Sequence, residues 1–308
     1  MRRENFTFVG ANGQDVFTWC WNTADIPLGI IQIFHGMAEH AERYNDFAVY
    51  MNTEGFAVYA CDQRGHGRTG ELNHSSNHVG NEGFDGIVED QKLLSKLIWD
   101  KYPDIPLYIL GHSFGSFVAQ EYIKHNSSDI SGVILSGSCM MKGTEVKAGY
   151  VAAMLSLIFG RGRPNKLLDK LSFGSYNKAI ENTVCKFSWL SRDEDQVKKY
   201  ETDNFCGNIM STNFFYCFFK GLNRLYDFNC TDKIPKTLPI YIMSGESDPV
   251  GKYGVGVKKL HAWYKTLGII DLQFKLYQDG RHEMLNELNR EEVYRDISAW
   301  LQKLGSSK

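Results

Sequence analysis

The sequence lacks the features that mark several classes of protein. Its longest apolar stretch, Tyr150 to Phe159, is too short to span a bilayer. Its 34 Lys and Arg residues are scattered and nearly balance 36 Asp and Glu residues, so the formal net charge is only -2. Because nucleic acid requires a basic surface, we expect neither a membrane span nor nucleic-acid binding.

The cysteines form no recognisable pattern. The 7 cysteines are odd in number and widely scattered, and no C-x-x-C pair occurs. This usage is typical of reduced thiols rather than of a disulfide framework. After the basic pair Arg2 and Arg3, the N-terminal segment has no long apolar stretch of the kind found in secretory signals. Together these absences predict a cytoplasmic protein.

No residue pattern indicates a metal ion or an organic cofactor. His35 and His40, and likewise His74 and His78, are closely spaced, but neither pair has further ligands at a convincing spacing. No dinucleotide-binding fingerprint follows a predicted strand. We therefore expect chemistry that needs no metal and no cofactor.

What the sequence does contain is an alternation of strand and helix patterns. A first hairpin is predicted at 5–10 and 14–21, turned at Asn12-Gly13. Short apolar runs then predict buried strands, and apolar residues at helical spacing predict helices between them. The predicted strands are 28–34, 56–61, 105–110, 132–136, 239–244 and 271–277, and the helices are 39–54, 85–102, 116–124, 255–267 and 283–304. This alternation predicts an α/β fold with a mostly parallel, doubly wound sheet.

The alternation is interrupted between residues 137 and 235. Segments there have helical spacing and are rich in aromatic residues, and no buried strand is evident. We therefore predict a core formed by residues 1–136 and 236–308, with residues 137–235 inserted as a helical cap. The size of the chain, 308 residues of which 43% are hydrophobic, suits one large core with such an elaboration.

Ser113 is the best candidate for a catalytic nucleophile. It is the central residue of Gly111-His112-Ser113-Phe114-Gly115, between an apolar strand and a predicted helix. Strand, G-x-S-x-G and helix together form a nucleophile elbow, a strained turn that lifts the serine hydroxyl above the sheet edge. A plain glycine-rich turn is the alternative interpretation, and the flanking segments disfavour it.

An activated serine needs a base and an orienting carboxylate. His282 follows the predicted strand 271–277 and would accept the Ser113 proton, and Asp248 follows the strand 239–244 and would orient the imidazole. Taken singly, His282 suits a residue ahead of the last helix, and Asp248 suits a turn. The order Ser, Asp, His is that of α/β-hydrolases. Glu246 is the alternative acid.

Two backbone N–H groups are predicted to form an oxyanion hole. One belongs to Phe114, the residue after the nucleophile, and the other to Met37, in the turn after the strand 28–34. Both assignments follow from position alone. The alternative for His35-Gly36-Met37 is a simple tight turn.

The motifs resemble those of monoglyceride lipase-like hydrolases. The segment from His35 to Tyr44 is similar to their H-G-x-x-E-H-x-x-R-Y signature, and Gly111 to Gly115 is similar to their G-H-S-M-G elbow, with Phe114 replacing methionine. Asp62 to Gly70 resembles their D-x-R-G-H-G-x-S-x-G segment, with Thr69 in place of serine. The acid and base segments around Asp248 and His282 match as well.

The resemblance implies hydrolysis of a carboxylic ester under a mobile cap. Glu39 and Arg43 would then lie near the polar head of the substrate, although an i, i+4 ion pair is the plainer interpretation. Asp62, Arg64 and His66 more plausibly brace the loop behind the site than take part in chemistry. The family also includes lysophospholipases and, more distantly, proline aminopeptidases.

The expected partner is a small-molecule ester with an apolar acyl or aryl part. Aromatic residues of the predicted cap suit a pocket for that part, and brief contact of the cap with a membrane surface is a further option. The substrate candidates are a monoacylglycerol, a lysophospholipid or a similar acyl ester. Two alternatives remain: a peptidase of the proline-aminopeptidase kind, in which Glu181 and Glu201 give only weak support for an amine site, and a non-catalytic binding protein that keeps the fold.

Overall fold

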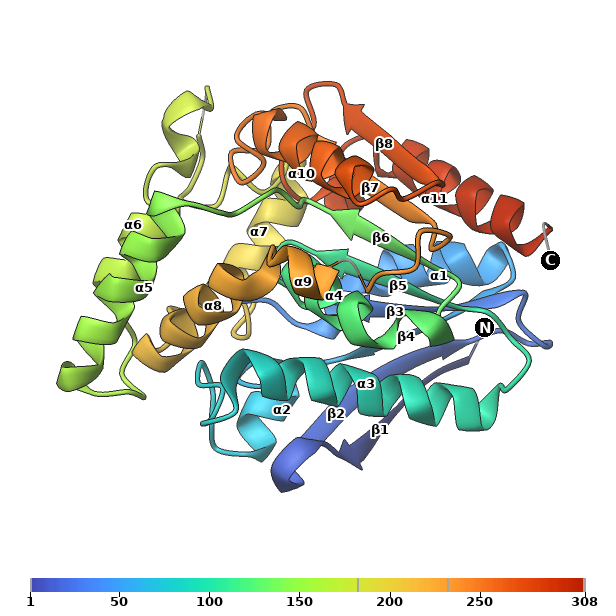
Figure 1. Cartoon of the computed structure of the whole chain (residues 1–308), viewed down its shortest axis with the longest axis horizontal. Helices are drawn as coiled ribbons and strands as arrows, with labels where there is room; N and C mark the ends of the chain where they lie inside the picture. The colour runs from blue at the N-terminus through green and yellow to red at the C-terminus, as the bar shows by residue number, and fades with distance from the viewer. Residues whose placement is uncertain (1, 182, 232, 307–308) are drawn as a thin grey trace.

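A computed structural model describes residues 2–181, 183–231 and 233–306. Residues 1, 182, 232, 307 and 308, which the predicted core and cap include, lie outside this description. The centre of the molecule is an eight-stranded sheet in the order β1-β2-β4-β3-β5-β6-β7-β8 (Figure 1). The strands are β1 Arg2–Val9, β2 Asp15–Asn22, β3 Gly29–Phe34, β4 Phe56–Cys61, β5 Leu107–His112, β6 Gly132–Ser136, β7 Ile240–Gly245 and β8 Leu272–Tyr277.

The sheet is mostly parallel, as predicted. β1 pairs antiparallel with β2, and β2 pairs antiparallel with β4, whereas all the other neighbours are parallel. The first hairpin turns through Asn12 and Gly13, which both have positive φ. Because parallel strands end at one edge, the loops after β3, β5, β7 and β8 lie on the same side of the sheet.

Helices cover both faces of the sheet. In β3, Ile30 and Phe34 belong to one hydrophobic cluster, while Ile31 and Ile33 belong to the other, which is the alternation expected of a strand buried on both sides. The first cluster includes side chains of α3 Gly83–Lys101, α4 Phe114–Asn126 and α10 Val255–Thr266, and the second includes those of α1 Asn45–Thr53 and α11 Arg290–Gly305. The doubly wound prediction is therefore confirmed.

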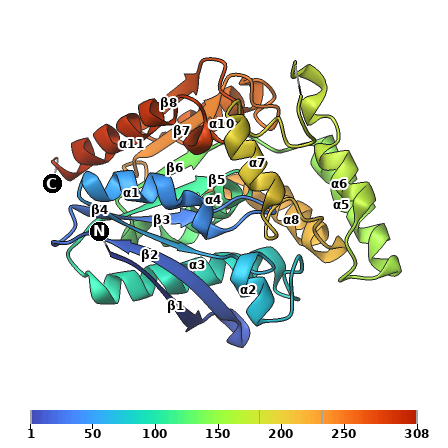
Figure 2. The same ribbon diagram turned by 180° about the vertical axis from the view of Figure 1, so that it is seen from behind.

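Between β6 and β7 the chain leaves the sheet. It forms α5 Thr144–Ser156, α6 Lys166–Phe173, α7 Glu194–Thr202, α8 Thr212–Leu225 and α9 Phe228–Thr231, with short 3-10 turns at Leu157–Phe159 and Tyr176–Ala179. Figures 1 and 2 show α5, α6 and α7 beyond the ends of the strands, with α5 and α6 outermost. No helix in the described part of the chain is both long and apolar enough to cross a membrane.

The helices of this insert differ in how they are attached. Phe214 and Phe218 of α8 pack against Phe114, with ring centroids 5.0 and 5.2 Å apart, so α8 is part of the main hydrophobic cluster. Ile158 and Phe159, after α5, are instead 79% and 72% exposed. One aromatic group thus anchors the insert, and another apolar group faces outward.

Two predicted helices begin later than expected. Residues 41–44 form a 3-10 turn ahead of α1, and the Ala41 N–H at its start donates to the Asp62 carboxylate. The last helix begins at Arg290 rather than at residue 283. The Glu287 carboxylate accepts the backbone N–H groups of Arg281 and Leu288, which holds residues 281–288 as a loop.

One helix was not predicted. α2 Gly67–Leu72 forms where the sequence suggested only the end of a loop, and the Asp62 carboxylate accepts the Arg68 N–H in its first turn, at 2.8 Å. A carboxylate at a helix N-terminus satisfies an N–H group that has no partner within the helix.

Candidate active site

Ser113 lies in a strained turn between β5 and α4. Its φ of 50° and ψ of -119° are far from those of ordinary strand or helix residues, which costs about 1–3 kcal/mol and is typical of functional sites. The Ser113 N–H donates to the Ser136 carbonyl at 2.9 Å, and the Ser116 hydroxyl donates to the Ser113 carbonyl at 2.6 Å. These bonds hold the turn in the geometry of a nucleophile elbow.

Gly115 allows α4 to start against the end of β3. A Cβ atom at this position would lie 1.9 Å from the Phe34 carbonyl oxygen, closer than any side chain tolerates. The first turn of α4 therefore sits directly beside the turn that follows β3. This proximity brings Phe114 and Met37, the two predicted oxyanion donors, onto neighbouring turns.

His282 and Asp248 meet at the carboxyl ends of β8 and β7. The His282 Nδ1 atom lies 3.0 Å from both carboxylate oxygens of Asp248. The carboxylate also accepts the Ser244 hydroxyl at 2.9 Å and the Val250 N–H at 2.8 Å. The acid that contacts His282 is thus Asp248, while Glu246 is exposed.

The electrostatics of this pair suit a general base. Burial lowers the pKa of His282, but Asp248, with Glu283 and Glu39, raises it more, so the pKa lies above its ordinary value. Burial raises the pKa of Asp248, and the contact with His282 more than offsets this effect, so the carboxyl group stays ionised. An ionised carboxylate on Nδ1 leaves Nε2 free to accept a proton.

Two aromatic rings hold the imidazole of His282. The His112 ring centroid lies 4.8 Å from that of His282, and the Trp189 centroid lies 5.1 Å from it. Burial lowers the pKa of His112 to about 4, so this ring stays neutral at pH 7. A neutral neighbour packs against His282 without opposing its protonation during a reaction.

The turn after β3 is tied to the insert at Ala38. This residue has φ 54°, and its carbonyl accepts both the Tyr200 hydroxyl at 2.8 Å and the Gly207 N–H at 2.9 Å. Met37 directly precedes it. As the first residue of α4, Phe114 has an N–H with no acceptor inside its own helix. The positions of both groups suit the predicted oxyanion hole.

A buried charge network links this turn to the histidine loop. Arg43 donates to Glu39 at 2.6 Å and makes a bidentate contact with Glu283, at 2.7 Å for each nitrogen. Tyr44 donates to Glu39 at 2.9 Å. One guanidinium thus serves two carboxylates, so an excess of negative charge remains beside His282. The network fixes the turn after β3 relative to the loop that carries the base.

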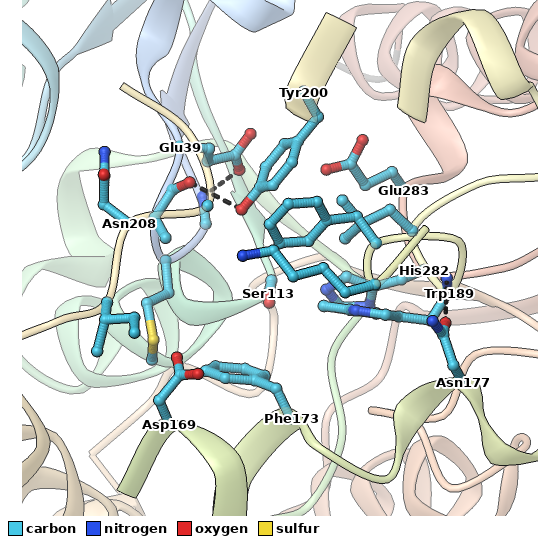
Figure 3. Close-up of a pocket in the computed structure, with 18 of the residues that line it drawn as sticks. Glu39, Ser113, Asp169, Phe173, Asn177, Trp189, Tyr200, Asn208, His282 and Glu283 are labelled. Carbon is cyan, nitrogen blue, oxygen red and sulfur yellow. Dashed lines mark hydrogen bonds between the residues drawn. The ribbon is translucent and has the colours of Figure 1, made fainter. Parts of the chain in front are cut away.

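A cavity of about 310 Å³ opens at Ser113 and His282. Figure 3 shows Glu39 and Glu283 on one side of Ser113, with Asp169 and Phe173 on the opposite side. The apolar lining consists of Met37, Phe173, Phe187, Trp189, Leu190 and Ile209, and polar groups are supplied by Asp169, Lys170, Asn177, Lys186 and Asn208. The cavity therefore has two carboxylates beside the base, and a lining of apolar side chains mixed with polar and charged ones elsewhere.

Most of the predicted site residues line the cavity, but Arg43 does not. Ser113, His282, Met37 and Glu39 line the cavity. Arg43 instead lines a neighbouring polar cleft and reaches the cavity only through the carboxylates that it holds.

Three residues of the site were missed by sequence analysis. Glu283 could have been noticed because it directly follows His282. Trp189 and Tyr200 belong to the insert, where no local pattern distinguishes residues that face the cavity from those that face away.

The loop behind the site is braced as expected. Arg64 is 2% exposed and pairs with Asp90, and the ring of His66 packs on Phe114 with centroids 6.2 Å apart. Burial lowers the pKa of His66 to about 4. Neither Arg64 nor His66 lines the cavity, so both support the walls of the site.

The sequence matches a family model and is similar to known lipases. The family model described as "Serine aminopeptidase, S33" matches residues 25–289. A monoacylglycerol lipase of Mycolicibacterium smegmatis is 26% identical over 306 residues, covering 97% of each chain. A monoglyceride lipase of Rattus norvegicus is 24% identical, covering 95% of this chain and 88% of its own.

A solved structure gives the same result for the fold. A thermostable carboxyl esterase from Bacillus coagulans, in complex with glycerol, superimposes with a TM-score of 0.91 at 29% identity, covering 99% of each chain. The α/β-hydrolase fold and the resemblance to monoglyceride lipase-like hydrolases are thereby confirmed.

Proposed function

We propose that this chain, a serine hydrolase of the lipase and esterase type that belongs to the serine aminopeptidase S33 family, cleaves monoacylglycerols through an acyl-enzyme on Ser113. The observation that carries this proposal is the cavity at Ser113, which has the carboxylates of Glu39 and Glu283 on one side and the apolar ring of Phe173 on the opposite side, next to Asp169. An ester of a polyol and a fatty acid likewise has a polar part and an apolar part. The lipase and esterase relatives support ester hydrolysis in general, and the fold by itself does not fix the substrate.

In the proposed reaction the Ser113 hydroxyl attacks the ester carbonyl. His282 takes the hydroxyl proton on Nε2, and Asp248 stabilises the resulting imidazolium through Nδ1. The N–H groups of Phe114 and Met37 would stabilise the oxyanion of the tetrahedral intermediate. Collapse of the intermediate breaks the ester C–O bond, and the imidazolium returns its proton to the leaving alcohol. Water then repeats the sequence on the acyl-enzyme and releases the acid.

The lining of the cavity suggests where the alcohol and the acyl chain of the ester would bind. Glu283 directly follows His282, so the end with Glu39 and Glu283 lies where the base returns its proton to the alcohol. The carboxylates there can accept hydrogen bonds from the hydroxyl groups of a neutral polyol and would repel a phosphate placed beside them, although Lys170 and Lys186 also line the cavity. We therefore favour a monoacylglycerol over a lysophospholipid, with the acyl chain directed toward Phe173 and the insert.

The insert would serve as a cap with an outward apolar surface. Val151, Leu155, Ile158, Phe159, Leu167 and Leu171 are exposed on α5, on the 3-10 turn after it and on α6. Exposed basic residues accompany them at Arg161, Arg163, Lys166 and Lys170. An apolar surface bordered by cations suits contact with an anionic lipid surface, from which a lipid ester could enter the cavity.

The peptidase alternative is less well supported. Glu181 and Glu201 are exposed, and neither lines the cavity. The acids that do line it at the base, Glu39 and Glu283, are already held by Arg43. An amine would have to compete with a bidentate guanidinium for them. A receptor would not require a strained serine beside a histidine and carboxylate pair, although the fold would permit one.

We expect the rate of hydrolysis to rise with acyl length. On p-nitrophenyl esters, each methylene that packs against the apolar lining should raise kcat/KM by up to about fourfold, the equivalent of about 0.8 kcal/mol. The gain should stop where the chain fills the cavity. 1-Monoacylglycerol should be a better substrate than lysophosphatidic acid with the same acyl chain. A flat profile, or a preference for acetyl esters alone, would contradict a lipid substrate.

The apolar surface makes a separate prediction. The double replacement of Ile158 and Phe159 by serine should lower the rate on monoacylglycerol in anionic vesicles by about tenfold or more, because each buried side chain contributes about 1.5–3 kcal/mol. The rate on a water-soluble ester should stay within about twofold, since neither residue lines the cavity. Ile270→Ser is the matched control, because Ile270 is 77% exposed beside the opposite end of β8. Equal losses on both substrates would contradict this role.

A further inference from the structure

Three metal-ligating side chains meet where the insert contacts the turn after β3. They are His40, Asp203 and Cys206, and their ligand atoms all lie within 4.8 Å of one another. The His40 and Cys206 side chains are buried, and Asp203 is half-buried. The sequence gives no sign of this group, because His40 is 163 residues away from Asp203.

We propose that His40, Asp203 and Cys206 form a binding site for a transition-metal cation, with Zn²⁺ as the best match. Imidazole nitrogen, thiolate sulfur and carboxylate oxygen are all ligands that Zn²⁺ takes in proteins, and three of them leave a fourth position for water. A neutral imidazole, a thiolate and a carboxylate together carry two negative charges. A divalent cation would neutralise them, which favours its retention in a buried place.

Two of the three ligands are already in direct contact. The His40 Nε2 atom lies 2.8 Å from one oxygen of Asp203, while the other oxygen accepts the Phe205 N–H at 2.8 Å. The Phe205 ring packs on the His40 ring with centroids 5.4 Å apart. A cation would replace the proton that His40 shares with Asp203. The Phe205 contacts would keep both ligands in place, as outer-shell groups do in metal sites.

Cys206 supplies the ligand that distinguishes this site from an ordinary ion pair. Its thiol is free, and burial raises its pKa even though Arg43 opposes the shift. Metal coordination deprotonates a thiol, so uptake of the cation should release a proton and depend on pH.

A route to the site exists from the solvent. His40 and Asp203 line a polar cleft of about 410 Å³ that also borders Glu42, Asp46 and Lys199. This cleft is distinct from the cavity at Ser113. A hydrated cation could enter there without passing the substrate.

Occupancy would connect the metal to the substrate cavity. His40 belongs to the same turn as Met37, and Cys206 directly precedes Gly207, whose N–H holds the Ala38 carbonyl. Gly207 and Asn208 line the cavity. A bound cation would fasten this segment of the insert to the turn after β3. We therefore expect it to raise thermal stability and to slow substrate turnover by restraining the cavity wall.

The test uses Co²⁺ as a spectroscopic substitute for Zn²⁺ on the full-length protein after chelator treatment. Co²⁺ should give the near-ultraviolet charge-transfer absorption of a cobalt–thiolate bond, and Zn²⁺ should abolish it by displacement. Zn²⁺ should also raise Tm. Cys206→Ala should remove the absorption and weaken Zn²⁺ binding by more than about tenfold. Cys20→Ala, at another buried cysteine, should leave both unchanged.

A second variant, Asp203→Asn, tests the site even if Cys206→Ala does not fold. An asparagine side chain in place of Asp203 can still accept the Phe205 N–H but is a poor metal ligand, so Asp203→Asn should fold and bind Zn²⁺ less tightly. Because Zn²⁺ can also inhibit by binding His282, loss of activity alone does not support the site. Absence of the thiolate absorption in the wild type would overturn the proposal, as would unchanged Zn²⁺ affinity in Cys206→Ala or Asp203→Asn. Neither result depends on the identity of the ester.

Discussion

Ser113→Ala should lower kcat for ester hydrolysis by about a millionfold, the loss found when the nucleophile of another serine hydrolase is removed. Without the hydroxyl, no acyl-enzyme can form, and His282 has no proton to accept. Binding of substrate should persist, because Ser113 is one residue of an extensive cavity lining. The measurement is kcat on a p-nitrophenyl ester, together with labelling by a fluorophosphonate probe, which should disappear.

The controls separate chemistry from folding. Alanine has the same Cβ atom as serine, so the strained backbone at position 113 is neither relieved nor worsened. The Tm of the variant should therefore match that of the wild type. Ser128→Ala, at an exposed serine, should retain both activity and labelling. Labelling that survives in Ser113→Ala would place the nucleophile elsewhere, and absence of labelling in the wild type would favour a binding protein.

The parts of the fold that could be predicted depend on local patterns. Most strands of the core are short apolar runs, whereas β8 alternates apolar and polar residues, and each predicted strand matches an observed one to within a few residues. The loops that follow these strands must share one edge of the sheet, which is why Ser113, Asp248 and His282 could be grouped from the sequence alone. Their distances could not be known, since they depend on long-range packing.

In the insert, local sequence patterns do not show which apolar side chains face the core and which face outward. Phe214 and Phe218 are spaced i, i+4 and turn one face of α8 toward the core. Ile158 and Phe159 are equally apolar, yet they face outward. The difference arises from which surface each segment meets. The same limit explains why the approach of Asp203 to His40, which joins distant parts of the chain, was not predicted.

Hydrogen bonds from backbone N–H groups to distant side chains accompany the differences between predicted and observed helix ends. Asp62 takes the Ala41 N–H on one carboxylate oxygen and the Arg68 N–H on the other. It therefore satisfies N–H groups at the start of the 3-10 turn ahead of α1 and in the first turn of α2. A sequence shows that Asp62 can accept hydrogen bonds, but not which N–H groups the fold will bring to it.

Asp248→Asn is expected to lower kcat by about ten-thousandfold, because the amide selects the wrong imidazole tautomer. In the wild type, one carboxylate oxygen of Asp248 accepts the Val250 N–H at 2.8 Å. In the variant, this N–H would hold the oxygen of the new amide in the same place, and the amide NH₂ would take the position of the second carboxylate oxygen, which also lies 3.0 Å from His282 Nδ1. It would donate to Nδ1 and leave the proton on Nε2, where Ser113 needs an acceptor.

The pH profile gives a second readout of the same change. In the wild type, kcat/KM should rise as pH increases through the pKa of His282, which Asp248 holds above 6.5, because only the neutral imidazole accepts a proton. Without the carboxylate, burial lowers that pKa, so the acidic limb of the profile should move to lower pH. Glu246→Gln is the matched control and should keep wild-type kcat and its profile. A loss in Glu246→Gln as large as in Asp248→Asn would assign the orienting acid to the wrong residue.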